Sequence, residues 1–252
     1  MTTTRVVEAY WMPGCSSCLR MKEFISRSGR NWVAINVDEQ LEARTALAGN
    51  GMKVPAARVG DRWVSGIDLA AVADLIDVPY DPPTILPSEQ LAARYLSILH
   101  VARATIAQMT PEMLSYRLPH RNREMFDVAN QVASVMRAFL TAYSDDRHAA
   151  VQYYNKPADI QTQLDLLDRL EETERRFEVW WEEDGIDDPL DRVVQTSWGY
   201  PTLHEILERE VWHTAQHLRQ LQYVLRQFGV EPDEPLGEAN LTGLPLPSGI
   251  HD

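Results

Sequence analysis

Cys15 and Cys18 are the only cysteines of this 252-residue chain, and they stand two residues apart in the segment YWMPGCSSCLRMKEF. A thiol attacks as its thiolate. The start of the helix expected after Cys15 favours that form, because unpaired backbone N–H groups and the positive end of the helix dipole lie there. Cys18, one turn deeper, is within reach to resolve a mixed disulfide formed on Cys15. The pair therefore predicts a dithiol that exchanges with disulfides.

Two other interpretations of the cysteine pair remain open. A C-x-x-C motif also serves as half of a zinc site, and two thiols can be chemically inert. Zinc needs two further ligands, and no histidine occurs in the sequence before His100. The strand expected directly before the motif favours the redox interpretation.

His213 and His217 form a second group with the types and spacing of chemically active residues. They are four residues apart within EREVWHTAQHLRQL, so one face of a helix can present both to a single divalent metal. Histidines that only pack or form hydrogen bonds are the alternative. Apolar neighbours predict that the pair points into the protein interior, and these are Leu207, Val211, Leu218, Leu221 and Leu225.

A third metal ligand must come from another helix. His100 and His120 are candidates, of which His100 is the better placed, although a core histidine is the alternative for it. Glu210 and His213 also form an E-x-x-H step. Di-iron bundles need such a step on two helices, and the sequence holds only this one.

The first third of the chain is expected to alternate strands and helices. Apolar runs and turn residues between positions 5 and 76 predict the order β-α-β-α-β-β-α, with a hairpin that turns at Gly60–Asp61. Four prolines within residues 77–87 remove backbone donors and indicate a linker. We therefore expect one domain over residues 1–78 and a proline-rich linker over residues 79–87.

From Ser88 onward, apolar residues recur at three- and four-residue spacing, which is typical of amphipathic helices. Ser88 is expected to cap the first helix. Thr202 and Glu205 form a capping-box pattern at the start of the last helix, which ends at Gly229. The four predicted helices cover residues 88–109, 123–143, 159–183 and 202–229. They predict an all-α bundle over 88–230 and an irregular tail over 231–252.

Charge and composition restrict the partners and the compartment. The net charge of −13 argues against nucleic acid or a membrane surface as the main partner, because phosphate binding needs clustered Lys and Arg. No apolar run approaches the roughly 18 residues of a membrane span, and residues 1–12 lack the features of a signal peptide. We expect a cytoplasmic protein, in which a disulfide is transient and catalytic.

Residues 5–76 resemble glutaredoxins and the related redoxins that act with ribonucleotide reductase. The matching segments are AYWMPGCSSC at 9–18, VPA at 54–56 and WVSGIDLAAVADL at 63–75. The resemblance implies an α/β thioredoxin-like N-terminal domain in which Pro55 follows a cis peptide bond and faces the dithiol. It also implies that glutathione or a similar low-molecular-weight thiol binds the backbone of Val54 and lies near Gly66 and Asp68.

Residues 89–230 resemble the DinB-like superfamily of four-helix bundles. Its members include metal-dependent transferases that join mycothiol, bacillithiol or glutathione to small electrophiles, and a thiol-dependent maleylpyruvate isomerase. The family motif is one His on the second helix and H-x-x-x-H on the fourth, which His213 and His217 match. Gln131 occupies the expected position on the second helix, with Asn130 as the neighbouring alternative. The resemblance implies a divalent metal, zinc or another, held by His213, His217 and Gln131.

Three further features have a functional and a structural interpretation. Trp180 and Trp181 line a substrate pocket or belong to the core. Arg121 and Arg123, in the one basic cluster of an acidic chain, bind a carboxylate-bearing ligand or lie in a solvated loop. His204 is a surface or capping residue.

These observations together predict a two-domain cytoplasmic enzyme of thiol chemistry. A C-x-x-C thiol-disulfide oxidoreductase would act with a transferase-like bundle on a small electrophile or thiol conjugate. The expected partners are a small-molecule thiol or electrophile, a reductase for the dithiol, and a second copy of the chain. One alternative is a plain glutaredoxin-type oxidoreductase whose helical domain recruits a client or dimerises. Another is a redox- or metal-sensing interaction module without turnover.

Overall fold

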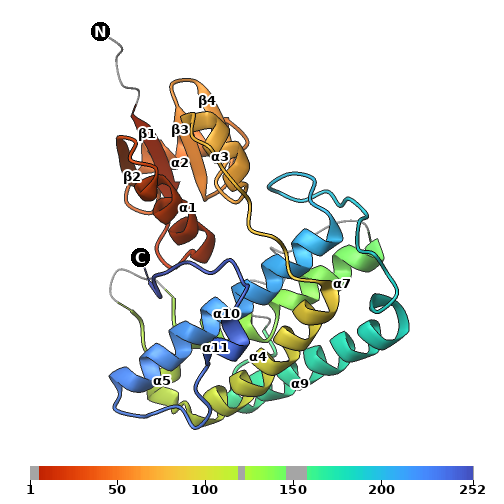
Figure 1. Ribbon diagram of the computed structural model, residues 1–252. Helices are drawn as coiled ribbons and strands as arrows, with labels where there is room; N and C mark the ends of the chain where they lie inside the picture. Colours follow the sequence, from red (N-terminus) through yellow and green to blue (C-terminus); the bar gives the residue numbers. More distant parts are fainter. Residues whose placement is uncertain (1–5, 119–122, 146–157, 252) are drawn as a thin grey trace. The chain divides into compact units, whose positions relative to one another are not determined.

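The computed structural model describes residues 6–118, 123–145 and 158–251 (Figure 1). The chain forms two compact units, which are described separately below. The dithiol unit comprises Met1–Thr84, Ser197–Gly199 and Pro247–Asp252, and the helical unit comprises Ile85–Thr196 and Tyr200–Leu246. Within the described ranges, no helix combines the length and apolar character needed to cross a membrane.

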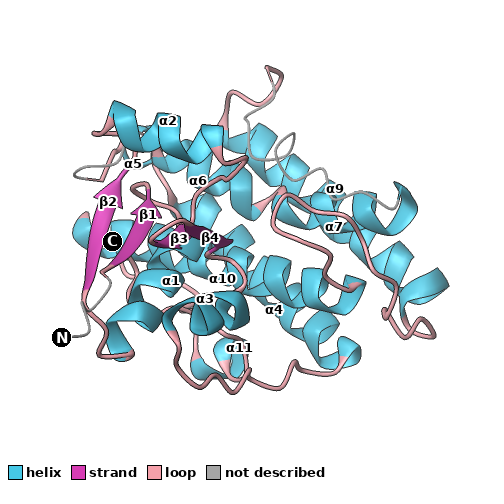
Figure 2. Ribbon diagram, turned by 90° about the horizontal axis from the view of Figure 1, so that it is seen from above, coloured by secondary structure: helices cyan, strands magenta, loops and turns pink. Residues whose placement is uncertain are grey.

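The dithiol unit is built around a mixed four-stranded sheet. Its elements are β1 (Val7–Trp11), α1 (Ser16–Arg27), β2 (Trp32–Asn36), α2 (Leu41–Gly49), β3 (Ala56–Val59), β4 (Arg62–Ser65) and α3 (Leu69–Ile76). The strands lie in the order β2-β1-β3-β4, with β1 parallel to β2 and the other pairs antiparallel (Figure 2). The element order predicted from the sequence is confirmed.

The β3–β4 hairpin turns where the sequence predicted it. Val59 pairs with Arg62, so Gly60 and Asp61 form a two-residue connection. Gly60 has a φ of 61°, a left-handed conformation that glycine adopts without steric cost.

The sheet has a hydrophobic core on each face, because successive residues of a strand point in opposite directions. Val7 and Ala9 of β1 pack in a cluster with Met21 and Ile25 of α1 and with residues of α3. Tyr10 of the same strand points to the other face of the sheet, where it belongs to a second cluster with residues of α2. The sheet is thus covered on both faces, and α1 is held against β1.

At Gly66 the backbone packs closely against Met21 and Pro55. Its N–H donates a hydrogen bond to the carbonyl oxygen of Pro55 at 2.8 Å. A Cβ atom at this position would lie 2.2 Å from Sδ of Met21 and 2.8 Å from Cβ of Pro55. Only glycine therefore lets the segment after β4 pack between α1 and the residue that precedes β3.

Gly66→Ala is expected to lower the free energy of unfolding by about 1–3 kcal/mol, because its methyl group overpacks this contact. Chemical denaturation measures the change. Gly49→Ala, at the end of α2, is the matched control, since no atom lies within 4 Å of the added Cβ. It should leave stability unchanged or raise it by about 0.5–1 kcal/mol. Equal losses in the two variants would contradict the packing argument.

The helical unit consists of long helices packed around α10. Its helices are α4 (Ser88–Gln108), α5 (Pro111–Ser115), α6 (Met125–Val132), α7 (Val135–Asp145), α9 (Gln163–Trp180), α10 (Leu203–Gln227) and α11 (Glu238–Leu241), with a π-helical turn at Trp181–Gly185. Helix α10 packs against α4, α6 and α7, and α4 also packs against α9.

The prediction of one continuous second helix is wrong, because this segment divides into α6 and α7. The break falls at Ala133 and Ser134. The N–H of Ser134 bonds to the carbonyl of Gln131 at 2.9 Å, one residue short of the α-helical partner. Its hydroxyl bonds to Asn130 and accepts a 2.7 Å hydrogen bond from Arg169. These side-chain bonds compete with a continuous helix.

Of the two predicted helix caps, one is confirmed and the other is wrong. Thr202 and Glu205 form the predicted capping box of α10. Ser88 is not a cap, because Pro87 occupies that position and Ser88 is the first helical residue. Within the segment expected to be an irregular tail, α11 forms a short helix, and Ser248 and Gly249 donate backbone hydrogen bonds to Glu23 of the dithiol unit at 2.9 and 2.8 Å.

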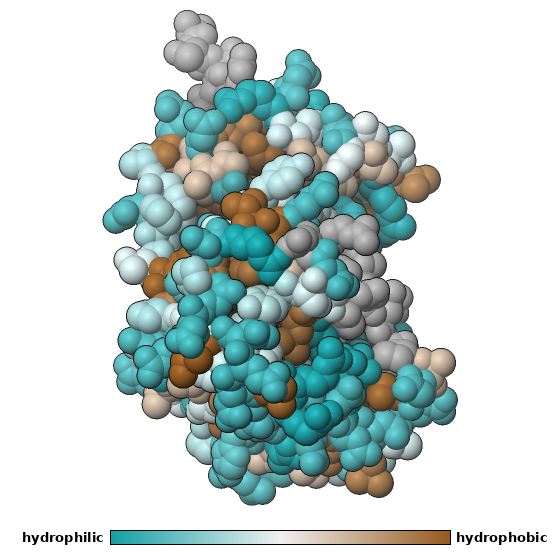
Figure 3. All heavy atoms as spheres, turned by 90° about the vertical axis from the view of Figure 1, so that its right-hand side faces the viewer, coloured by the Kyte–Doolittle hydropathy of each residue, from teal (hydrophilic) through white to brown (hydrophobic). Residues whose placement is uncertain are grey.

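The surface drawn in Figure 3 is mostly hydrophilic, and its apolar residues lie in small groups between polar ones. Among the described residues, the most exposed large apolar side chains are Leu41, Tyr200 and Leu164, which are far apart in the sequence. Single exposed apolar residues of this kind are ordinary on a protein surface.

Candidate functional site

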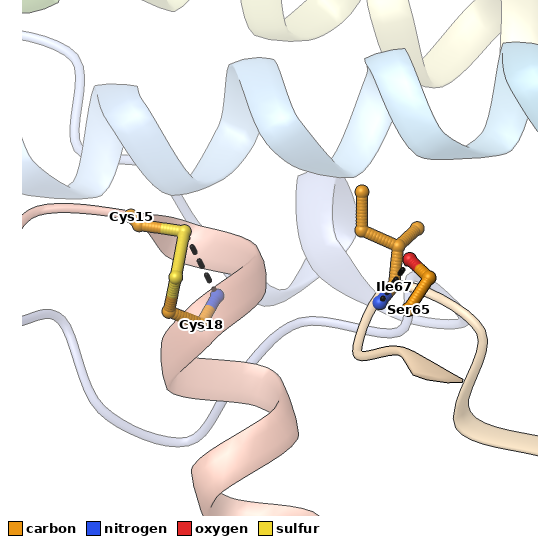
Figure 4. Close-up of a disulfide and its surroundings, with 4 residues drawn as sticks. All are labelled: Cys15, Cys18, Ser65 and Ile67. Carbon is orange, nitrogen blue, oxygen red and sulfur yellow. Dashed lines mark hydrogen bonds between the residues drawn. A yellow bond between two sulfur atoms is a disulfide. The ribbon is translucent and has the colours of Figure 1, made fainter. Parts of the chain in front are cut away.

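The two cysteines form a disulfide at the N-terminal end of α1 (Figure 4). Cys15 is the N-cap residue, and its Sγ accepts a hydrogen bond from the backbone N–H of Cys18 at 3.1 Å. The start of the helix thus directs a donor at the sulfur of Cys15, as the sequence predicted. A thiolate formed there on reduction gains the same donor and the favourable end of the helix dipole.

The two sulfurs differ in their access to solvent. Cys18 has an exposed fraction of 0%, whereas Cys15 is only partly buried. An external disulfide can therefore reach Cys15 and not Cys18. This asymmetry matches the roles assigned to them, with Cys15 attacking and Cys18 resolving.

Pro55 and Gly66 contact each other in space, whereas Asp68 caps a helix. The Val54–Pro55 peptide bond is cis, as the resemblance to glutaredoxins implies, and Pro55 directly precedes β3. Asp68 caps α3, where its carboxylate accepts a hydrogen bond from the N–H of Ala71 at 3.0 Å. Binding of a thiol by Val54, Gly66 and Asp68 stays a prediction.

Ser65 and Ile67 are drawn with the disulfide in Figure 4, where they stand at the turn between β4 and α3. The N–H of Ile67 bonds to the hydroxyl of Ser65 at 3.4 Å. This bond helps to fix the turn that carries Gly66 and so positions the residues that pack on Pro55.

Sequence reasoning missed Lys22. Its Nζ lies 3.6 Å from the centroid of the Trp11 ring, at the end of β1. Trp11 shares a face of the sheet with Val7 and Ala9, which is the face that α1 covers. Lys22 follows Cys18 by four residues and therefore lies one turn away on the same side of α1. This spacing was the available signal for a cation on the same side of α1 as Cys18.

His213 and His217 lie together within the helical unit. Their ring centroids are 4.6 Å apart, and both side chains are buried. Nδ1 of His217 is 3.0 Å from Oε1 of Gln220. Nδ1 of His213 is 3.7 Å from Oε2 of Glu210, whose other oxygen pairs with Arg209 at 2.5 Å.

Burial lowers the pKa of His213, and the charge of Arg209 acts in the same direction. The nearby carboxylate of Glu210 opposes this effect without reversing it. The lowered pKa favours the neutral imidazole, so the buried carboxylate of Glu210 has Arg209 as its cationic partner.

Gln131 is buried on α6, the helix that packs against α10. Its Oε1 has no hydrogen-bond partner among the residues that the structure describes. His100 is wrong both as a third ligand and as a core residue, because its side chain is 71% exposed and pairs with Glu234 at 2.9 Å. His120 lies outside the described residues. His204 is no simple surface residue, since its Nε2 is 2.8 Å from the carbonyl oxygen of Leu86.

The donor set does not fit a conventional divalent metal centre. No three His, Cys, Asp or Glu side chains within the described parts of the chain are grouped so that they could hold a metal ion. A carboxamide such as Gln131 is a weaker donor than imidazole. Metal binding by His213, His217 and Gln131 stays a prediction from the resemblance.

Trp180 belongs to the core. It is buried and contacts Phe139 edge-to-face, with ring centroids 4.8 Å apart. It also packs against Phe177 and Tyr143. The core interpretation of Trp180 is therefore confirmed, and the aromatic cluster explains its burial.

Comparison with known proteins adds no family assignment. Neither a scan against protein-family models nor a search of the curated proteins finds a match. The geometry of the two groups of side chains therefore carries the functional argument.

Arg209→Met should lower the free energy of unfolding by about 3–5 kcal/mol, because it leaves the carboxylate of Glu210 buried without this cation. The two side chains are 11% and 0% exposed. The matched control is Arg226→Met on the same helix, where the pair with Glu231 is 45% and 84% exposed. Its loss should stay below about 1 kcal/mol. Similar losses in the two unfolding titrations would contradict the role of burial.

Proposed function

We propose that the protein is a cytoplasmic thiol-disulfide oxidoreductase with a thioredoxin-like dithiol unit. The order of its strands and helices, the cis bond before Pro55 and the cysteine pair at the start of α1 support this proposal. The observation that carries it is the difference in exposure between partly buried Cys15 and fully buried Cys18.

The proposed reaction transfers two electrons from the dithiol to a substrate disulfide. The thiolate of Cys15 attacks one substrate sulfur, which forms a mixed disulfide and releases the other sulfur as a thiol after protonation. Cys18 then loses its proton and attacks Sγ of Cys15. The second substrate thiol leaves, and the Cys15–Cys18 disulfide forms. Two equivalents of glutathione or a similar thiol, or a dithiol reductase, return the protein to the reduced state.

Cys18→Ser should accumulate a mixed disulfide on Cys15, because no second thiol remains to release the substrate. Cys15→Ser should form almost none, because the remaining sulfur is buried. Intact-protein mass spectrometry after treatment of each reduced variant with oxidised glutathione measures the adduct. An adduct of equal yield in both variants would contradict the assigned roles, and turnover by Cys15→Ser would remove the mechanism.

We propose for the helical unit a DinB-like bundle that binds a small electrophile or thiol conjugate. Buried polar side chains on α10, among them Glu210, His213 and His217, support a binding role, because an interior used only for packing is normally apolar. Covalent linkage of the units raises the effective concentration of each for the other. If the two units act on one substrate, Cys15→Ser should lose turnover of that substrate. If the bundle only recruits a client, Cys15→Ser should still bind the client.

A further inference from the structure

Polar residues lie along α6 and just beyond its two ends, and we call them the α6 stripe. Asp127 and Gln131 are four residues apart on the helix and share a face, and Asn130 lies beside Gln131. Arg123 precedes the helix by two residues and Ser134 follows it by two. Asn130, Gln131 and Ser134 are buried. Helix α6 packs against α10, which carries its own buried polar stripe of Glu210, His213 and His217.

Several groups in the α6 stripe have unused hydrogen-bonding capacity. Nδ2 of Asn130 and Oε1 of Gln131 are buried and have no hydrogen-bond partner within the described part of the chain. The guanidinium of Arg123 makes a single hydrogen bond there, of 3.4 Å, to the backbone oxygen of Asp127. Buried polar atoms are nearly always paired in proteins, so unpaired groups on two consecutive residues indicate that another molecule completes them.

Asp127 acts electrostatically on Arg123 without forming an ion pair with it in the described structure. It directs its carboxylate to the backbone N–H of Glu124 at 3.3 Å. Glu210 is paired with Arg209. The guanidinium of Arg123 lies against the carbonyl of Asp127 on α6, the helix that packs against α10. Burial lowers the pKa of Arg123 itself, as expected for a cation removed from water.

We infer that the layer between α6 and α10 binds a small carboxylate that also bears an N–H or O–H donor. The guanidinium of Arg123 and Nδ2 of Asn130 are the donors for the carboxylate, and Oε1 of Gln131 accepts from the second group. A guanidinium binds a carboxylate with two parallel hydrogen bonds, and the pair is stronger where water is excluded. The site does not involve the dithiol, and it gives Gln131 a role other than the metal binding that the resemblance implies for it.

Thermal unfolding of the full chain in a concentration series of succinate and of N-acetylglycine tests the inference. We expect each carboxylate to raise the unfolding temperature of the native protein, because a ligand that binds only the folded state stabilises it. N-acetylglycine carries the additional N–H donor and should bind more tightly. The neutral amides succinamide and N-acetylglycinamide should have no such effect. Neither set of probes contains a thiol, so failure of the proposed redox function would not alter the result.

Arg123→Met should weaken the apparent affinity for both carboxylates by about tenfold to a hundredfold, the range for loss of a charged hydrogen bond. Without ligand, this variant should be as stable as the native protein or more stable, because an uncompensated buried charge has been removed. Arg117→Met is the matched control, since Arg117 is exposed and pairs with Glu124 at 3.0 Å. It should retain the native response.

Two outcomes would overturn the inference. One is a native protein whose unfolding temperature does not respond to any of the carboxylates. The other is an equal response in Arg123→Met, which would identify a general salt effect on stability rather than a site. Because the comparison is made between ligand-dependent shifts, a change in the stability of a variant does not obscure it.

Discussion

Helix α10 is buried along most of its length, and the rest of the helical unit is arranged around this constraint. Side chains on several of its faces are covered by α4, α6 and α7. Its polar groups therefore exchange water for protein partners. Gln222 shows the consequence, because its amide binds Thr105 of α4 and the backbone of Glu234 and Leu236. A polar residue of the central helix thus fixes the course of the segment that follows it.

The proposed function sets the opposite requirement for the dithiol unit, since a reactive dithiol must remain accessible. Close packing at Gly66 holds the turn after β4 against Pro55, while the cysteine that begins α1 stays partly exposed. Thiol-disulfide exchange at a surface sulfur needs a hydrogen-bond donor to the thiolate and open access for the substrate disulfide. Recognition of a small molecule needs desolvated polar groups. In the functions proposed above, the dithiol unit has the first kind of site and the helical unit has the second.

Local patterns predicted the elements well, because spacing and capping act over a few residues. Cys15 at the N-cap, the hairpin at Gly60 and the capping box at Thr202 all follow from neighbouring residues. The break at Ser134 depends on its bond to Arg169, which is distant in sequence. The exposure of His100 likewise depends on how α4 packs. The sequence pattern also marked the polar residues of α10 without indicating which were paired, since pairing is decided by tertiary contacts.

The bonds from Ser248 and Gly249 to Glu23 have a consequence for the order of folding during synthesis. The strands and helices of the dithiol unit are complete in the nascent chain once α3 has been made. The two backbone partners of Glu23 are made only after the whole helical segment, whose translation takes on the order of ten to thirty seconds at about 5–20 residues per second. The unit that is synthesised first is therefore completed last.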